Sequence, residues 1–365
     1  MPSEKPIARI ALSISTRPGR PARENPAYRG AQVAMDELKG DDILPVRLDW
    51  KMFDDFGDPE KSERLAREIV ADSTFIGVVG PMGSTEAFAN APIFNKAGIV
   101  HVSPCASHPD LCKQGYKTFF RLVANEDMQG RELARMAYGY LKASRLAVVN
   151  ADDVWGNTVS DIVVREYEKL GGKVVERQKT ASRVVEDLTD LIKATVEAKP
   201  DLVFFAVHPQ EGSAVSKGLR DAGLKVPFLG TDAMKTAFPL GGGEKDADAY
   251  HTYSGADFRR LPSAAAFREA YVARYPEDST YSPEAYDSIM IVAEALRRAG
   301  VPDRARVLEE VRKLQNFEGV SGRVNFDPTG ERIDAPVSFY RVRKTDKGLE
   351  MGYVGVTPEL LPLEG

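Results

Sequence analysis

The sequence predicts an α/β protein made of two doubly wound lobes. Short apolar runs of strand length alternate with amphipathic stretches of helical length, and this alternation occurs twice along the chain. The strands are continuously apolar, which is typical of parallel sheets covered by helices on both faces. The length of 365 residues also fits two domains better than one.

The first series of elements runs from residue 7 to residue 102. Pro92 falls inside its third helix, and proline should break or kink a helix because it lacks the N–H group that the helix needs. The expected elements are strand 7–14, helix 26–38, strand 44–50, helix 59–71, strand 75–79, helix 84–96 and strand 99–102.

The second series runs from residue 130 to residue 229. Gly171 and Gly223 follow two of its helices, where a left-handed cap is expected. A polar surface loop is expected over 241–246. The elements are helix 130–142, strand 145–150, helix 156–170, strand 173–177, helix 186–198, strand 202–207, helix 210–222 and strand 227–229.

The last third of the chain departs from this alternation. It is either a small third domain or a segment that returns to complete both lobes, and we favour the second because it needs no separate core. Its expected elements are helices 264–274, 283–299 and 304–314, followed by short strands at 324–326, 336–342 and 351–354.

Composition excludes several classes of function. The chain has 49 Lys and Arg against 54 Asp and Glu, a net charge of −5, whereas a general nucleic-acid binder needs a basic face. No apolar run approaches the ~18 residues of a membrane span. Two cysteines and four histidines leave little material for a structural zinc site. We expect a soluble protein with no metal, no cofactor and no nucleic-acid partner.

The start of the chain and its cysteines bear on the compartment. No charged segment followed by an apolar one begins the sequence, so we predict no signal peptide in it. The protein is then either cytoplasmic or exported with its leader removed. Cys105 and Cys112 share a proline-containing loop, and we expect a disulfide between them in an oxidising compartment. The alternative is two unrelated thiols in a cytosolic protein.

Motifs for catalysis are missing. The sequence has no G-x-S-x-G elbow, P-loop, H-E-x-x-H or C-x-x-C. A serine hydrolase built on Ser84 remains formally open, but nothing places a histidine beside that serine. We therefore expect no enzymatic activity.

Two small-residue turns point to a binding site. Gly80–Thr85 lies between a buried strand and a helix, and the N–H groups and dipole of a helix N-terminus favour an anion such as a carboxylate. Ser84 as a simple N-cap is the alternative. A second such turn, Ser103–Ser107, follows the next strand, and neighbouring parallel strands bring their carboxyl ends to one edge.

Several motifs together suggest a family. They are Gly80-Pro-Met-Gly-Ser-Thr85, Ser103-Pro-Cys-Ala-Ser107, Asp153-Val-Trp-Gly156, Phe228-Leu-Gly-Thr-Asp232 and the Gly319-Val-Ser-Gly322 ending. In this order the chain resembles, over essentially its whole length, the leucine/isoleucine/valine-binding protein family. These are type I periplasmic binding proteins that serve ABC importers of branched-chain and other amino acids.

The resemblance implies ligand-binding residues in both lobes. In lobe 1, Ser84 would bind the ligand carboxylate, while Cys105, through its carbonyl, and Ser107 match the family's second turn. In lobe 2, Trp155 matches the aromatic residue that covers the ligand, and Asp232 matches a glutamate that pairs with the ammonium group. By themselves, Trp155 would more often be a packing residue, and Asp232 a solvated carboxylate or an N-cap.

Departures from the family affect the identity of the ligand. Val207 replaces a tyrosine that some members carry. Tyr28 either lines the pocket or packs under it. The first loop carries Arg17, Arg20 and Arg23, which are either solvated or placed to meet an acidic ligand side chain.

The resemblance thus implies two Rossmann-like lobes joined by three hinge crossings, near 121–126, 252–256 and 332–337. Lobe 1 is expected to comprise 6–122 plus 254–334, and lobe 2 to comprise 123–253 plus 335–362. We expect a monomeric periplasmic protein that captures an amino acid or close analogue between its lobes and passes it to a membrane ABC permease. The alternative is a cytoplasmic amide sensor of the same fold.

Overall fold

The computed structural model describes residues 5–16, 21–40, 42–182, 184, 187–275, 281–346 and 348–357. The chain divides into two compact units. Unit 1 comprises Met1–Ala124 and Gly255–Ala335, and unit 2 comprises Asn125–Ser254 and Pro336–Gly365. The chain therefore passes from one unit to the other three times, and neither unit is a continuous stretch of sequence.

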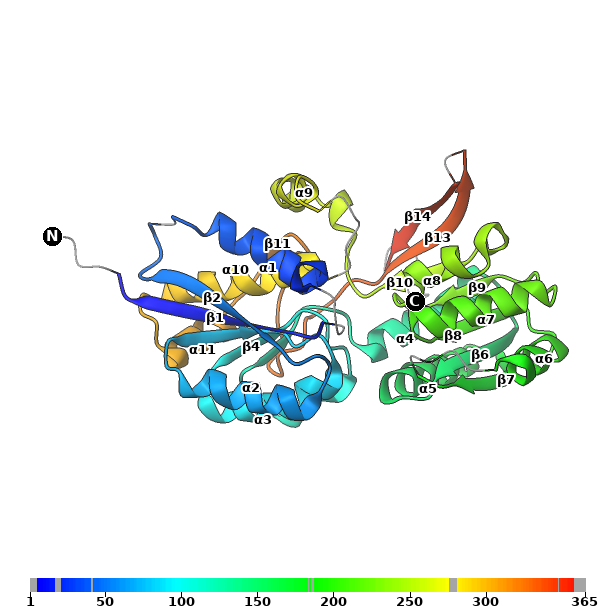
Figure 1. The fold of residues 1–365 in the computed structure, drawn as a ribbon, viewed down its shortest axis with the longest axis horizontal. Coiled ribbons are helices and arrows are strands. Elements are labelled where there is room, and N and C mark those ends of the chain that lie inside the picture. The colour runs from blue at the N-terminus through cyan, green and yellow to red at the C-terminus, as the bar shows by residue number, and fades with distance from the viewer. Residues whose placement is uncertain are drawn as a thin grey trace. The chain divides into compact units, whose positions relative to one another are not determined.

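Unit 1 is a parallel five-stranded sheet in the order β2-β1-β3-β4-β5. Helices α1 and α10 cover one face, and α2 and α3 cover the other (Figure 1). Its main elements are β1 (Ile7–Ile14), α1 (Pro26–Glu37), β2 (Arg47–Asp54), α2 (Pro59–Ala71), β3 (Phe75–Val79), α3 (Ser84–Ala97), β4 (Val100–Ser103), β5 (Phe119–Arg121), α9 (Ala265–Val272), α10 (Ser282–Ala299), α11 (Arg304–Arg312), β11 (Phe317–Gly319) and β12 (Gly322–Val324).

The core of unit 1 lies on both faces of this sheet. Strand β3 is buried along its whole length, which accounts for its uninterrupted apolar sequence. Helix α10 is buried at most of its positions, so it acts as an interior element and not as a surface helix with one apolar stripe. This packing fixes the positions of the loops that follow β3 and β4.

Unit 2 is a seven-stranded sheet in the order β14-β13-β10-β9-β8-β6-β7. Strands β10, β9, β8, β6 and β7 are parallel, and the hairpin β13–β14 adds two antiparallel strands at one edge. Its elements are α4 (Glu126–Arg135), β6 (Arg145–Ala151), α5 (Val154–Lys169), β7 (Lys173–Thr180), α6 (Thr189–Glu197), β8 (Leu202–Ala206), α7 (Pro209–Asp221), β9 (Phe228–Gly230), α8 (Met234–Gly241), β10 (Tyr250–Tyr253), β13 (Ser338–Thr345) and β14 (Gly348–Val356).

The predicted fold class is confirmed, and most elements begin and end within a few residues of their expected bounds. Strand 44–50 is one exception, because β2 begins at Arg47 and continues to Asp54. Leu44 and Val46 belong to the buried core ahead of the strand. Their apolar character therefore reflects burial and not strand pairing.

The helix expected over 130–142 also differs. It begins at Glu126, because the Asn125 side chain caps it by accepting the Met128 N–H at 2.8 Å. It passes into a π-helical turn over Met136–Tyr140. The apolar pattern located the helix but not its cap.

Pro92 does not end its helix. Helix α3 continues from Ser84 to Ala97 with the proline inside it. Ala91 and Phe94, on either side of the proline, are buried. Tertiary packing of this helix thus offsets the loss of one backbone hydrogen bond.

The loop expected over 241–246 is not a simple surface loop. Gly241 is the last residue of α8, and Gly243–Asp246 forms a 3₁₀ turn. Asp246 is fully buried, pairs with Arg220 at 2.9 Å and accepts the Ser216 hydroxyl at 2.5 Å. A polar sequence here encodes a buried ion pair.

Among the residues that the structure describes, no helix has both the length and the apolar character needed to cross a membrane.

Candidate functional site

The carboxyl edge of the unit 1 sheet begins with a turn that requires glycine. Gly80 follows β3 with a φ of 108°, and a Cβ at this residue would lie 1.9 Å from the Ser13 carbonyl oxygen. Gly83 is the N-cap of α3, and Ser84 is the first residue of the helix. The alternative prediction that Ser84 is an N-cap is therefore wrong, and its hydroxyl has another use.

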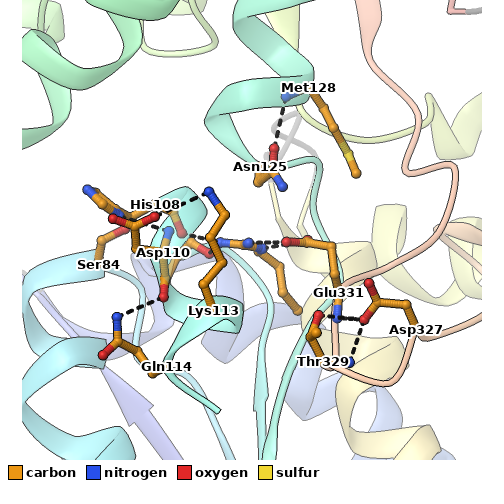
Figure 2. A network of polar contacts seen from close by, with 12 residues as sticks. Ser84, His108, Asp110, Lys113, Gln114, Asn125, Met128, Asp327, Thr329 and Glu331 are labelled. Atoms are coloured by element: carbon orange, nitrogen blue, oxygen red, sulfur yellow. Dashed lines mark hydrogen bonds and ion pairs between the residues drawn. The ribbon is translucent and has the colours of Figure 1, made fainter. Parts of the chain in front are cut away.

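Ser84 is linked to the second predicted turn. Its Oγ accepts the His108 N–H at 3.1 Å (Figure 2), and the Ser103 Oγ accepts the Ala106 N–H at 3.0 Å. The two turns thus lie together, as expected from their adjacent strands. A hydroxyl oxygen that accepts one hydrogen bond can still donate its own proton, so Ser84 can serve as a donor to an anion.

The structure places Cys105 and Ser107 in the turn that Ser84 holds. Both are half-buried. The predicted disulfide, however, is absent, because Cys105 and Cys112 are not joined. Cys112 lies in a small buried apolar cluster that does not include Cys105. Burial there raises the pKa of the Cys112 thiol to about 12, which disfavours the thiolate needed for disulfide chemistry.

His101, on strand β4, forms a hydrogen bond to the first of these turns. It is fully buried on β4, and its Nε2 donates to the Gly80 carbonyl at 2.6 Å. Its ring makes edge contacts with Phe94 and Phe119. Burial lowers the pKa of His101 to about 4. His101 is therefore a neutral support for the Gly80 turn at neutral pH.

Tyr28 has a packing contact. Its ring lies 5.4 Å from that of Trp50, centroid to centroid, and its hydroxyl donates to Gln32 at 3.3 Å. These contacts with Trp50 and Gln32 fit the alternative that Tyr28 packs under the pocket. Arg23 is exposed in the first loop, and Arg17 and Arg20 lie outside the described residues.

In unit 2, Trp155 stands on the first turn of α5 beside a histidine. Its ring centroid lies 5.0 Å from that of His208, with the rings tilted by 31°. His208 Nε2 donates to Asp153 at 2.7 Å, and the Ser182 hydroxyl donates to the same carboxylate at 2.5 Å. Although burial raises the pKa of Asp153, these bonds and the Gly156 N–H hold it well below its usual value. The Trp155 ring thus lies beside an imidazole that an ionised carboxylate orients.

Asp232 follows strand β9 and is half-buried. Its Oδ1 accepts a hydrogen bond from the side-chain amide of Gln129 at 3.3 Å. Gln129 is buried on α4, and its amide also lies within bonding distance of the Thr252 and Ser254 hydroxyls, at 3.2 and 2.5 Å. The Gln129 amide, a hydrogen-bond donor, therefore helps to orient the Asp232 carboxylate.

Val207 lies entirely within the buried apolar cluster of unit 2. An apolar side chain here packs against the sheet, and it supplies no hydroxyl to a ligand.

Sequence reasoning missed the residues that hold these side chains in place. Gln129 contacts Asp232 across more than 100 positions of sequence, and Arg121 contacts Glu331 across 210. Neither pair has a local pattern that could reveal it. His208 had one signal, because it lies two residues after the end of a buried strand and directly before a helix-starting proline.

Within the described part of the chain, no group of three or more His, Cys, Asp or Glu side chains is arranged to hold a metal ion. The polar groups described above at the two sheet edges include hydroxyls, carbonyls, imidazoles, an amide and carboxylates. Such groups are suited to hydrogen bonding and charge pairing with a small polar ligand.

Two doubly wound units, each with polar groups at the carboxyl edge of its sheet and joined by three chain crossings, define a two-lobed solute-binding protein. The family model described as periplasmic binding protein matches residues 14–348. The chain belongs to this family, which confirms the resemblance seen in the sequence.

Known relatives agree. An amino acid binding protein of Pseudomonas aeruginosa is 28% identical over 329 residues, which is 87% of this chain and 85% of that protein. A Leu/Ile/Val-binding protein of Rhizobium johnstonii is 24% identical, over 86% of this chain and 85% of that one. The structure of a branched-chain amino acid transporter substrate binding protein from Streptococcus pneumoniae, in complex with isoleucine, has a TM-score of 0.83 at 21% identity. The structural match covers 95% of this chain and 99% of the Streptococcus pneumoniae chain.

Proposed function

We propose that this protein binds an amino acid, or a close analogue with a carboxylate and an ammonium group, and delivers it to a membrane ABC permease from the periplasm. The observation that carries this proposal is Asp232, a half-buried carboxylate that follows β9 and accepts a hydrogen bond from the side-chain amide of Gln129. A carboxylate oriented in this way is suited to a cationic group on a ligand.

The ligand carboxylate would bind to unit 1. Ser84 donates its hydroxyl proton at the N-terminus of α3, where the helix dipole favours a negative charge. The Ser107 hydroxyl would be a further donor in the second turn, whereas the Cys105 carbonyl is an acceptor and would bind the ammonium group of the ligand. The relatives' names, which specify amino acids, support the same class of ligand.

Unit 2 would supply the ammonium contact and an aromatic cover. Asp232 pairs with the ammonium, and the Trp155 ring lies against the apolar part of the ligand. The three chain crossings would act as hinges. Closure is favoured only to the extent that unit 2 binds the ligand more tightly in the closed state.

No bond of the ligand would be broken. Ser84 has the His108 backbone N–H as its neighbour and not an imidazole nitrogen, so the arrangement needed to activate a serine nucleophile is not formed at this residue. Incubation with amino acid esters and amides, followed by chromatography, should therefore show no turnover.

The test is a thermal-shift and calorimetric screen against the twenty protein amino acids, their amides and the acids that lack the amino group. At 100 times Kd a ligand stabilises by about 2.7 kcal/mol. We expect at least one amino acid to bind and its amino-free analogue to bind far more weakly. Tighter binding of an amino-free acid would contradict the proposal, and tighter binding of an amide would favour the amide-sensor alternative.

A spectroscopic measurement tests the role of Trp155. The chain has two tryptophans, so Trp50→Phe leaves Trp155 as the only one. Its fluorescence should change as ligand is added, because its environment becomes less aqueous. The reciprocal variant, Trp155→Phe, should show little change from Trp50, and a reversed pattern would contradict the assignment.

A further inference from the structure

Arg121 is the last residue of β5, and its side chain is completely buried. Its Nε donates to Glu331 Oε1 at 2.8 Å, and its Nη2 donates to the other carboxylate oxygen. The pair is therefore bidentate, which is the strongest and most directional geometry for these groups.

The remaining nitrogen of the guanidinium faces the ligand turn. Nη1 donates to the His108 carbonyl at 2.7 Å and to the Ala106 carbonyl at 3.3 Å. These two carbonyls flank Ser107. The N–H groups of the same two residues, His108 and Ala106, donate to the Ser84 and Ser103 hydroxyls. The turn is therefore fixed through both its backbone donors and its backbone acceptors.

Glu331 is itself held in a defined position. Its backbone N–H donates to Asp327 at 3.1 Å, and the same Asp327 oxygen accepts the Thr329 N–H at 2.7 Å and its hydroxyl at 2.6 Å (Figure 2). A second link joins the same segments, because the Arg121 N–H donates to the Gly330 carbonyl at 3.0 Å.

We propose that the Arg121–Glu331 pair is a positioning device that sets residues 104–108, which comprise most of the second small-residue turn and His108, in their binding geometry. Arg121 lies three residues before the first chain crossing and Glu331 four before the third. The segments that lead into two of the crossings therefore also hold the turn. The effect of this pair on ligand affinity rests on the proposed function. Its effect on the conformation of the turn does not depend on any ligand.

Arg332 provides a matched control. It is equally buried and adjacent to Glu331, and it donates to the carbonyls of Leu122, Ser321 and Arg323. None of these carbonyls belongs to the ligand turn. Replacing either arginine by lysine keeps the charge but removes the planar fork of donors.

The experiment compares Arg121→Lys, Arg332→Lys and Glu331→Gln by hydrogen exchange of the ligand-free protein. We expect Arg121→Lys to speed exchange of amides over 104–110 about tenfold or more, and Glu331→Gln to do so by less. Arg332→Lys should lower the melting temperature without this local effect. Equal exchange over 104–110 in the Arg121 and Arg332 variants would overturn the proposal, and Glu331→Gln decides it if Arg121→Lys does not fold.

The second readout is binding of the twenty protein amino acids at 1 mM each. Arg121→Lys should weaken the best-bound amino acid about tenfold relative to Arg332→Lys. Equal losses in the two variants would show a merely structural role and would also overturn the proposal. If the wild-type protein binds none of them, the proposed function fails, and the exchange comparison still decides the role of Arg121.

Discussion

The candidate site residues of unit 1 are backbone groups and small hydroxyl side chains in two turns, whereas those of unit 2 are a large aromatic side chain and a charged one. In unit 1, the Ser84 hydroxyl accepts the His108 N–H, and the buried Arg121 donates both to Glu331 and to the His108 carbonyl. In unit 2, the Gln129 amide donates to Asp232, and the Trp155 ring packs at a tilt against His208. A site made of backbone groups needs a rigid frame, while side-chain contacts can change with one substitution.

This difference predicts that ligand selectivity is more easily altered in unit 2. A carbonyl or N–H in a fixed turn recognises the groups that all amino acids share. The side chains of unit 2 are free to vary without disturbing the sheet.

The largest expected effect is that of Asp232→Asn. Removing the charge while keeping the shape should cost about 2–5 kcal/mol of binding free energy for a ligand with an ammonium group. Calorimetry gives the change in Kd, and Asp127→Asn is the control because Asp127 is a partly exposed aspartate on α4. A loss of less than about threefold would exclude the charge-pairing role.

The next effect concerns stability and pH in unit 1. Burial lowers the pKa of His101 to about 4 from 6.5. The unfolded state therefore binds more protons over this range, and the stability contributed by neutral His101 is complete above pH 6.5 and falls as the pH approaches 4. The loss is about 3 kcal/mol at most.

His101→Phe should remove this dependence, so its stability relative to wild type rises as the pH falls from 7 to 4. Asp287 acts in the opposite direction, because burial raises its pKa to about 6. The folded state then binds more protons than the unfolded state from pH 6 to 3.8, so Asp287 adds stability as the pH falls through this range. Asp287→Asn removes this contribution, and its stability relative to wild type should fall on acidification. Denaturant titration in a Trp155→Phe background reports unit 1 through Trp50; identical pH profiles for both variants would contradict the assignment.

A smaller effect is expected for Gln129→Leu. It removes a buried hydrogen bond to the Asp232 carboxylate, and a bond to a charged group is worth about 1.5–3 kcal/mol. Affinity should fall about tenfold. Gln178→Leu is a matched control, since Gln178 donates to Glu176 on β7, away from Asp232. Equal affinities in the two variants would show that Asp232 needs no support from Gln129.

The smallest expected effect is that of Ser84→Ala, about 1–2 kcal/mol of binding free energy. It should weaken an amino acid more than the corresponding amide, because the lost donor faces the carboxylate. Ser288→Ala removes a buried hydroxyl that donates to Glu284 within α10 and serves as the control. If acid and amide lose affinity equally, the carboxylate does not bind at Ser84.

Local pattern determined most of the fold. Strands such as β1 and β3 were located because apolar runs of strand length lie between amphipathic helices, and burial on both faces produces that pattern. Pro92 misled this reasoning, because buried neighbours keep α3 intact. Asp246 also misled the prediction, because a run of polar residues predicts a surface loop even where a partner such as Arg220 is buried beside one of them.

The sequence by itself determined the fold class, the family and the two turns at Ser84 and Cys105, because these depend on nearby residues and on motifs in order. The tertiary structure alone decided which side chains support those turns. Arg121 meets Glu331, and Gln129 meets Asp232, across more than 100 residues of chain. Such pairs form only after the sheets bring distant segments together, and a charged or amide side chain has no periodicity that reveals its partner in advance.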